Sequence, residues 1–270
     1  MTSSTFTKIL IGIFILILGA IFYVLFLEGS NYNFLGSPSS TSTASVTAEH
    51  PSITMQTITD TDPINHLDIT ATYPQLSGLS NTVAETNINT DIEANVNSMI
   101  SAFKTNETGN GPVSGPFVDA TSTLEITAST TLPATIANVI SVRLDQDAMS
   151  AGAAHPTSQA TVLHYNLSTG VALTLDDLFV GDYLDTLAST TVPILTKSLG
   201  SYADQDMISS GASALATNYQ NFIVEDNGFL IVFNQYQVAP YVVGEQDVLI
   251  PYVSLTTVIN PSGPLAPFLH

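Results

Sequence analysis

The sequence predicts an α+β fold, with antiparallel sheets that are each covered on one face by helices. The sheets belong to two closely packed subdomains that follow a single transmembrane helix. Three observations predict this: a charge-free apolar run at Ile9–Leu27, a long amphipathic helical pattern at Val83–Phe103, and a hairpin signal around Asp226–Gly228. Strands, one helix, further strands, helices and a last hairpin follow one another, an order typical of α+β domains.

The apolar run Ile9–Leu27 contains 19 residues without a charge. At 1.5 Å per residue it spans roughly 28 Å, close to the hydrocarbon thickness of a bilayer. We interpret it as an uncleaved signal-anchor helix, with a cleaved signal peptide as the alternative. Lys8 precedes the run and Glu28 follows it, which predicts residues 1–8 as a cytoplasmic head and the rest as extracytoplasmic. The expected location is therefore the cell membrane, with a single pass.

Residues 28–63 are rich in Ser, Thr, Gly and Pro and predict a stalk. The first subdomain is expected at 64–132. Alternating apolar residues predict a strand at 67–73, and apolar spacings of three and four predict the helix Val83–Phe103, which begins with a capping box of Thr82 and Glu85.

The second subdomain is expected at 133–260, and an irregular tail at 261–270. Its predicted strands are 138–145, 159–167 and 171–175, the last two forming a hairpin. Two helical stretches follow, 183–200 with a kink or break at Pro193, and 204–217. The segments NFIVE and FLIVF around the turn DNG predict another hairpin, and DVLIPY predicts a last strand.

The charge of the chain restricts its partners. Three cations follow Leu27 against 23 acids, and nucleic-acid binding depends on Lys and Arg, so we expect no nucleic-acid partner. A basic partner or a cation fits this balance. The absence of Cys excludes disulfides and thiolate chemistry.

The segment from Phe233 to Tyr252 supplies the first candidate site. Tyr236, Tyr241 and Tyr252 are expected either to pack between the hairpin and the last strand or to form an aromatic platform for a sugar or a protein. Gly244 permits a tight turn there.

His155, in the small-residue loop that contains Gly152, is the second candidate. The small residues would allow a ligand to approach the backbone, whereas a histidine bonded to the backbone is the plainer reading. A metal site with His164, Asp176 and Asp177 lacks a spacing that would fix the ligands, so no metal and no cofactor is predicted. No G-x-S-x-G elbow is present either.

Three stretches resemble one family of extracytoplasmic modules. The stretches are YPQLSGLSNTVAETNINTDI, then VISVRL with SAGAAHPTSQATVLHYNLSTGVALTLDDLF, and the closing NFIVEDNGFLIVFNQYQVAPYVVGEQDVLIPY. The family that they resemble is the ectodomain shared by RsiV-type anti-sigma factors and PdaC-type peptidoglycan deacetylases. The resemblance covers about Leu67 to Leu255. It implies the α+β module alone, because we expect neither a sigma-binding domain in the short cytoplasmic head nor a deacetylase domain after the module.

We therefore expect a membrane-anchored binding module that engages a cell-wall component, or an extracellular protein such as lysozyme. The ligand-binding candidates are His155, Gly152, Tyr236, Tyr241 and Gly244. Two alternatives stay open: an envelope hydrolase that uses His155 with an acidic partner, and a structural surface protein. A binding function is favoured over an enzymatic one. The expected partner of Ile9–Leu27 is the lipid bilayer.

Overall fold

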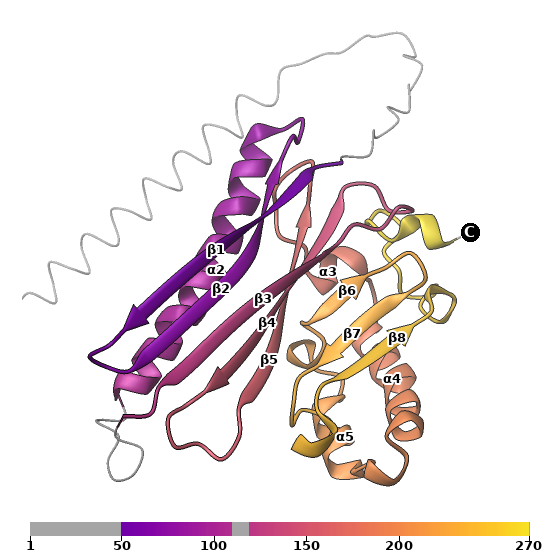
Figure 1. Cartoon of the computed structure of the whole chain (residues 1–270). Helices are drawn as coiled ribbons and strands as arrows, with labels where there is room; N and C mark the ends of the chain where they lie inside the picture. The colour runs from indigo at the N-terminus through magenta and orange to yellow at the C-terminus, as the bar shows by residue number, and fades with distance from the viewer. Residues whose placement is uncertain (1–49, 110–118, 270) are drawn as a thin grey trace, which may run out of the picture. The chain divides into compact units, whose positions relative to one another are not determined.

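The computed structural model describes residues 50–109 and 119–269 (Figure 1). The predicted cytoplasmic head, the predicted membrane helix Ile9–Leu27 and the first part of the predicted stalk lie outside these residues. Within residues 50–109 and 119–269, none of the helices combines the length and the hydropathy needed to cross a bilayer.

The first half of the chain forms a five-stranded sheet in the order β1-β2-β3-β4-β5. The strands are β1 (Ser52–Asp62), β2 (Leu67–Ser77), β3 (Ser122–Thr131), β4 (Val139–Met149) and β5 (Thr157–Asn166). All neighbours are antiparallel except β2 and β3, which are parallel. The sheet is mostly antiparallel, as expected, but contains this one parallel pair, because helix α2 (Thr82–Gly109) returns the chain to the end of the sheet where β2 began.

Helix α2 covers one face of this sheet (Figure 1). Its buried stripe recurs at the predicted spacing and consists of Ala84, Ile88, Ile92, Val96, Ile100 and Phe103. The cap differs from the predicted capping box. Asn81 Oδ1 accepts from the backbone N–H groups of Val83 and Ala84, at 3.1 and 3.2 Å, and Glu85 instead accepts from the Leu79 N–H. Asparagine, one residue earlier than expected, therefore starts the helix.

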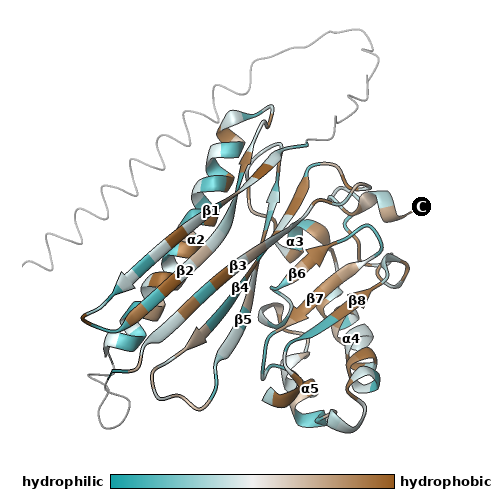
Figure 2. Cartoon of the chain, viewed as in Figure 1, coloured by the Kyte–Doolittle hydropathy of each residue, from teal (hydrophilic) through white to brown (hydrophobic). Residues whose placement is uncertain are grey.

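Strand β1 lies inside the range predicted as stalk, so the stalk cannot extend to residue 63. The prediction failed because an edge strand with little burial shows no clear alternation of apolar residues: most of β1 is exposed or half-buried. In Figure 2 polar colours interrupt β1, whereas the strands of the second sheet are mostly hydrophobic.

The second half of the chain forms a three-stranded antiparallel sheet, in the order β6-β7-β8, with three helices. The strands are β6 (Phe222–Val224), β7 (Phe229–Phe233) and β8 (Gln246–Ile250), and the helices are α3 (Leu175–Leu178), α4 (Tyr183–Leu199) and α5 (Gln205–Gly211). The predicted hairpin around the DNG turn and the predicted last strand are confirmed.

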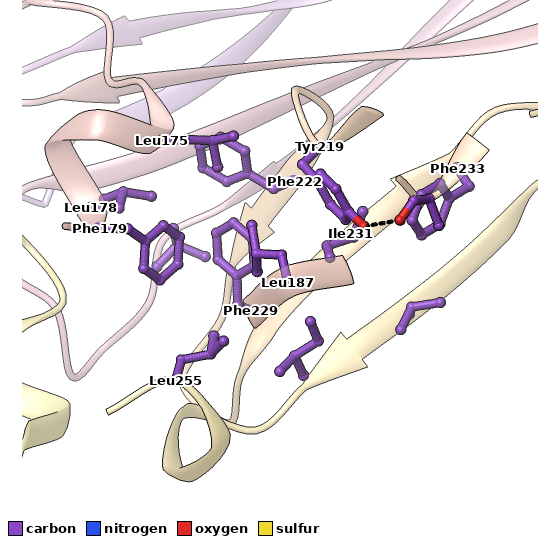
Figure 3. Close-up of a cluster of buried hydrophobic side chains, with 14 of the residues drawn as sticks. Leu175, Leu178, Phe179, Leu187, Tyr219, Phe222, Phe229, Ile231, Phe233 and Leu255 are labelled. Carbon is purple, nitrogen blue, oxygen red and sulfur yellow. Dashed lines mark hydrogen bonds between the residues drawn. The ribbon is translucent and has the colours of Figure 1, made fainter. Parts of the chain in front are cut away.

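One face of this small sheet packs on the helices and the other on β5. Phe222, Phe229, Ile231 and Phe233 join a cluster with Leu187 of α4 (Figure 3). On the opposite face, Ile223 and Val232 pack against Ala160 and Val162 of β5. Because α2 covers the other face of the large sheet, β5 lies between two hydrophobic clusters.

Two asparagine side chains join the halves of the chain along the free edge of β5. Asn221 Oδ1 accepts from the Val162 N–H at 3.1 Å, and its Nδ2 donates to the Ala160 carbonyl at 3.1 Å. Asn234 accepts from the Ala160 N–H at 2.7 Å and donates to the same carbonyl. These side chains satisfy edge groups that would otherwise lack a partner.

Several local expectations differ from the structure. The boundary expected at 132/133 falls between β3 and β4, which are neighbours in one sheet. Residues 171–175 form only an isolated bridge, Tyr165 to Ala172, since α3 begins at once. Helix α4 continues through Pro193, and α5 ends at Gly211, earlier than expected. The tail, predicted as irregular, contains a short 3-10 helix at Ala266–Leu269.

Candidate functional site

Three of the predicted candidates, His155, Tyr236 and Tyr241, form one group of rings, which we call the aromatic cluster. The ring centroids of His155 and Tyr241 are 4.1 Å apart, and those of Tyr236 and Tyr241 are 5.6 Å apart. His155 lies in the loop between β4 and β5, whereas both tyrosines lie between β7 and β8. The packing of the small sheet on β5 therefore brings together residues that are distant in sequence.

A single backbone carbonyl holds two of these rings. The Tyr241 hydroxyl donates to the Pro156 carbonyl oxygen at 3.2 Å, and His155 Nδ1 lies 3.0 Å from the same oxygen. Because a carbonyl only accepts, this contact places the His155 proton on Nδ1. Nε2 takes no part in this contact, so the cluster offers a second polar nitrogen beside apolar ring faces.

Tyr236 adopts a backbone conformation that is unusual for a bulky residue. Its φ is +67°, in the left-handed region, and the residue is 55% exposed. A large side chain in this region costs on the order of 1–2 kcal/mol relative to the usual conformations. The exposed, strained tyrosine is the kind of outlier that motivates a functional hypothesis.

The two candidate glycines shape the loops and make no ring contact. Gly152 has φ +82° in the loop that carries His155, and Gly244 has φ +76° directly after the turn Tyr241–Val243. Each permits a left-handed turn that other residues adopt at a cost. The two glycines therefore contribute indirectly, because their turns position the loops that carry His155 and Tyr241.

Arg143 of β4, which the sequence did not single out, anchors the segment after Tyr241. Its guanidinium binds Asp145 at 2.7 Å, is paired with Glu245, and lies 3.6 Å from Asp247. Burial raises the pKa of Glu245, and the hydrogen bond from Arg143 only partly offsets this. The ion pairs fix the end of the tyrosine-bearing loop against the large sheet, and no local pattern could have revealed contacts across this distance in sequence.

Tyr252 does not join the aromatic cluster. It is buried, stacks on Phe268 at 3.8 Å and donates its hydroxyl to the Glu225 carbonyl at 2.8 Å. For this tyrosine the packing alternative is correct.

The residues considered as metal ligands, His164, Asp176 and Asp177, do not form a metal site. His164 is buried against Phe222 at 3.6 Å, and Asp177 caps α3. Across residues 50–109 and 119–269 no three His, Cys, Asp or Glu side chains are grouped as a metal site would require. Nor does any carboxylate in those ranges form an ion pair with His155. The acidic partner that the hydrolase alternative requires is therefore not among the observed contacts of His155.

Comparisons with known proteins agree with this architecture. Residues 176–253, which include Tyr236, Tyr241 and Gly244, match the family model described as Protein of unknown function (DUF3298). Peptidoglycan-N-acetylmuramic acid deacetylase PdaC of Bacillus subtilis is 29% identical over 101 residues, which are 37% of this chain and 22% of PdaC. The chain thus matches less than a quarter of the length of that relative.

Two solved structures share the fold. A DUF3298 family member from Bacteroides fragilis aligns with a TM-score of 0.60 at 15% identity, covering 80% of this chain and 96% of its own. A DUF3298 family protein from Pseudomonas aeruginosa aligns with a TM-score of 0.55 at 13% identity, covering 79% of this chain and 96% of its own. They confirm the predicted α+β class. The chain therefore carries a DUF3298 match over residues 176–253 and has the fold of that family's solved members, which confirms its resemblance to the PdaC-type module.

Proposed function

We propose that this protein is a single-pass membrane-anchored module whose folded part lies outside the cell. Its aromatic cluster binds a cell-wall glycan or a basic extracellular protein such as lysozyme. The observation that carries the proposal is the meeting of His155, Tyr236 and Tyr241 at the surface. Three rings from two distant loops, one of them on a strained backbone, are more than packing requires.

The chemistry of the aromatic cluster suits both kinds of partner. Tyrosine combines an apolar face, on which a sugar ring or a side chain packs, with a polar hydroxyl. Exposed tyrosines anchored by a rigid scaffold are frequent centres of protein interfaces. The Pro156 carbonyl fixes two of the rings in advance, which lowers the entropy lost on binding.

The relatives and the charge support the setting. PdaC is named for its action on peptidoglycan, and similarity to part of it supports a cell-envelope location. The acid excess supports attraction of a basic protein through long-range steering.

The test is a calorimetric titration of the full-length protein in detergent micelles with soluble peptidoglycan fragments and, separately, with lysozyme. We expect Tyr241→Ala to weaken binding about 30-fold, since central interface tyrosines contribute about 2 kcal/mol or more. Tyr202→Ala is the control, because Tyr202 is an exposed tyrosine, at 57%, that lies outside the aromatic cluster.

The outcomes separate the parts of the proposal. Binding of neither partner, at low or at moderate salt, would remove the binding function. Binding that Tyr241→Ala and Tyr202→Ala weaken equally would remove the aromatic cluster as its site. Affinity for lysozyme that falls steeply with salt would favour the basic protein over the glycan.

A further inference from the structure

A second concave site lies at the end of β5, and we call it the edge pocket. It is a cavity of about 380 Å³ formed by the end of β5, the segment 172–176, Tyr183 of α4, Asp91 of α2 and residues around Gln220. His155, Tyr236 and Tyr241 do not line it. Its size is that of small-molecule sites, which are mostly apolar with a few convergent polar groups.

The edge pocket has an apolar interior and an acidic mouth. Leu163, Leu173, Leu175 and Phe222 contribute to its lining, and all four are buried or half-buried. Asp91 and Asp176 also line it, and both are exposed. The pocket therefore presents two carboxylates beside an apolar interior, a combination that suits a ligand with a charged head and an apolar stem.

Tyrosine hydroxyls hold both carboxylates in place. Tyr165 donates to Asp91 Oδ2 at 2.7 Å, and Tyr183 donates to Asp176 Oδ1 at 2.6 Å. Burial, followed by the hydrogen bond to Asp176, raises the pKa of Tyr183 to about 12, so its hydroxyl remains a donor at neutral pH. Each carboxylate keeps its second oxygen for another partner.

No cation of the chain neutralises these carboxylates within the described ranges. The ion pairs there join Lys104 to Asp60 and Arg143 to Asp145, Glu245 and Asp247. Two fixed carboxylates beside an apolar cavity, without a counter-ion from residues 50–109 or 119–269, attract an external cation.

His164 adds a polar atom to the inner wall. The residue is 5% exposed, and its Nε2 has no hydrogen-bond partner of ordinary geometry among the described residues. Nδ1 faces Ser141 Oγ at 3.3 Å, and the backbone of Gln220, which also lines the edge pocket, lies against the ring. Burial lowers the pKa of His164 to about 3, with a small opposing effect of the Gln220 carbonyl, so the wall carries no positive charge that would repel a cation.

We propose that the edge pocket binds a primary ammonium group carried on a short apolar chain. The chain enters between Leu163, Leu173 and Phe222, and the ammonium binds the second oxygens of Asp91 and Asp176. Two sources supply this chemistry: a free alkylamine and the lysine side chain of a peptide. The site is independent of the aromatic cluster and of the function proposed for it.

The experiment titrates the full-length protein in detergent micelles with n-hexylamine and with the peptide Ala-Lys-Ala, each against a neutral counterpart, n-hexanol and Ala-norleucine-Ala. Calorimetry measures affinity, and the methyl NMR signals of Ala172 and Ala216, which line the edge pocket, report the place of binding. We expect at least one amine to bind about tenfold or more tightly than its neutral counterpart, because charge-assisted hydrogen bonds are the stronger kind. Tight binding of hexylamine alone identifies a free amine, and tight binding of the peptide identifies a lysine side chain.

Matched variants test whether the two carboxylates at the mouth of the edge pocket bind the ammonium group. Asp91→Asn and Asp176→Asn keep an acceptor for each tyrosine hydroxyl while they remove the charge, and each should weaken the amine about tenfold and leave the neutral probe unchanged. Asp68→Asn, an exposed acid on β2 outside the edge pocket, should have no effect. Equal affinity for charged and neutral probes, no saturable binding of either amine, or equal effects of all three variants would overturn the proposal. Tyr241→Ala should leave amine binding unchanged.

Discussion

At the scale of single residues, Tyr236 shows how the aromatic cluster departs from what stability alone requires. Its left-handed backbone is disfavoured for tyrosine, and its exposed side chain contacts the ring of Tyr241. Asparagine tolerates this conformation better than other residues with a Cβ. Substitutions at position 236 can therefore separate the effect of backbone strain on stability from the effect of losing the ring contact.

We predict that Tyr236→Asn is more stable than Tyr236→Ala by about 0.5–1 kcal/mol, although both remove the ring. Both should weaken the binding proposed for the aromatic cluster to a similar extent. Urea unfolding of the two variants measures the first difference, and calorimetric titration the second. Equal stability of Asn and Ala at this position would mean that the φ of +67° is not a source of strain.

The sequence identified the members of the aromatic cluster as candidates, but it did not show that they lie next to one another. The hydroxyl of Tyr241 binds a carbonyl 85 positions away, a contact that depends on how the small sheet packs on β5. Arg143 and the edge-pocket residue Asp91 were missed for the same reason, and Asp176 was considered only as a metal ligand. Their neighbours come from other elements, and a single acid or arginine in a strand or helix carries no local signal.

At the scale of elements, the turn after β5 is fitted to the start of α2. Gly170 has φ +71°, and a Cβ there would lie 2.6 Å from Ala84 Cα, well inside contact distance. Ala84 is fully buried on α2, and Asn81, the cap of that helix, donates from Nδ2 to the Ser168 carbonyl at 2.9 Å. The turn and the first turn of the helix thus form one packed unit.

We predict that Gly170→Ala lowers the free energy of unfolding by about 3 kcal/mol or more, through a left-handed alanine and a backbone clash. Gly181→Ala is the matched control, because Gly181 has a similar φ of +66° but open space around it, so only about 1 kcal/mol should be lost. Thermal unfolding of both variants gives the comparison. Equal losses would show that the approach to Ala84 is not tight.

Elements with strong local patterns were predictable, and those defined by their neighbours were not. The stripe of α2 and the turn between β6 and β7 follow from apolar spacing and from Asp226–Gly228. Strand β1 was missed because its polar residues serve an exposed edge. The parallel pairing of β2 with β3 depends on the direction in which α2 returns, and no residue of either strand encodes it.

At the scale of the whole molecule, a buried neutral histidine links stability to pH. His164 has a pKa of about 3 in the folded protein, because burial disfavours its charged form, against about 6.5 when unfolded. Between these values the unfolded chain binds more protons, so stability is fully present above pH 6.5 and falls as the pH decreases toward 3.

We predict a loss of about 2 kcal/mol in the free energy of unfolding between pH 7 and pH 5 from this residue. His164→Phe keeps a ring to stack on Phe222 but cannot be protonated, so its stability should change much less over the same interval. Urea unfolding at both pH values measures the two slopes. Identical slopes would assign the acid sensitivity to other groups.

Asn221 and Asn234, which bind the free edge of β5, have a consequence for how many copies of the protein behave together. The unpaired backbone groups of an edge strand can form hydrogen bonds with the same strand of another molecule, and such pairing is a common start of aggregation. Asn221 and Asn234 occupy the backbone groups of Ala160 and Val162 that such pairing would use. Two amide side chains thus take the place of a sixth strand, and crowded molecules are kept from polymerising through this side of the sheet.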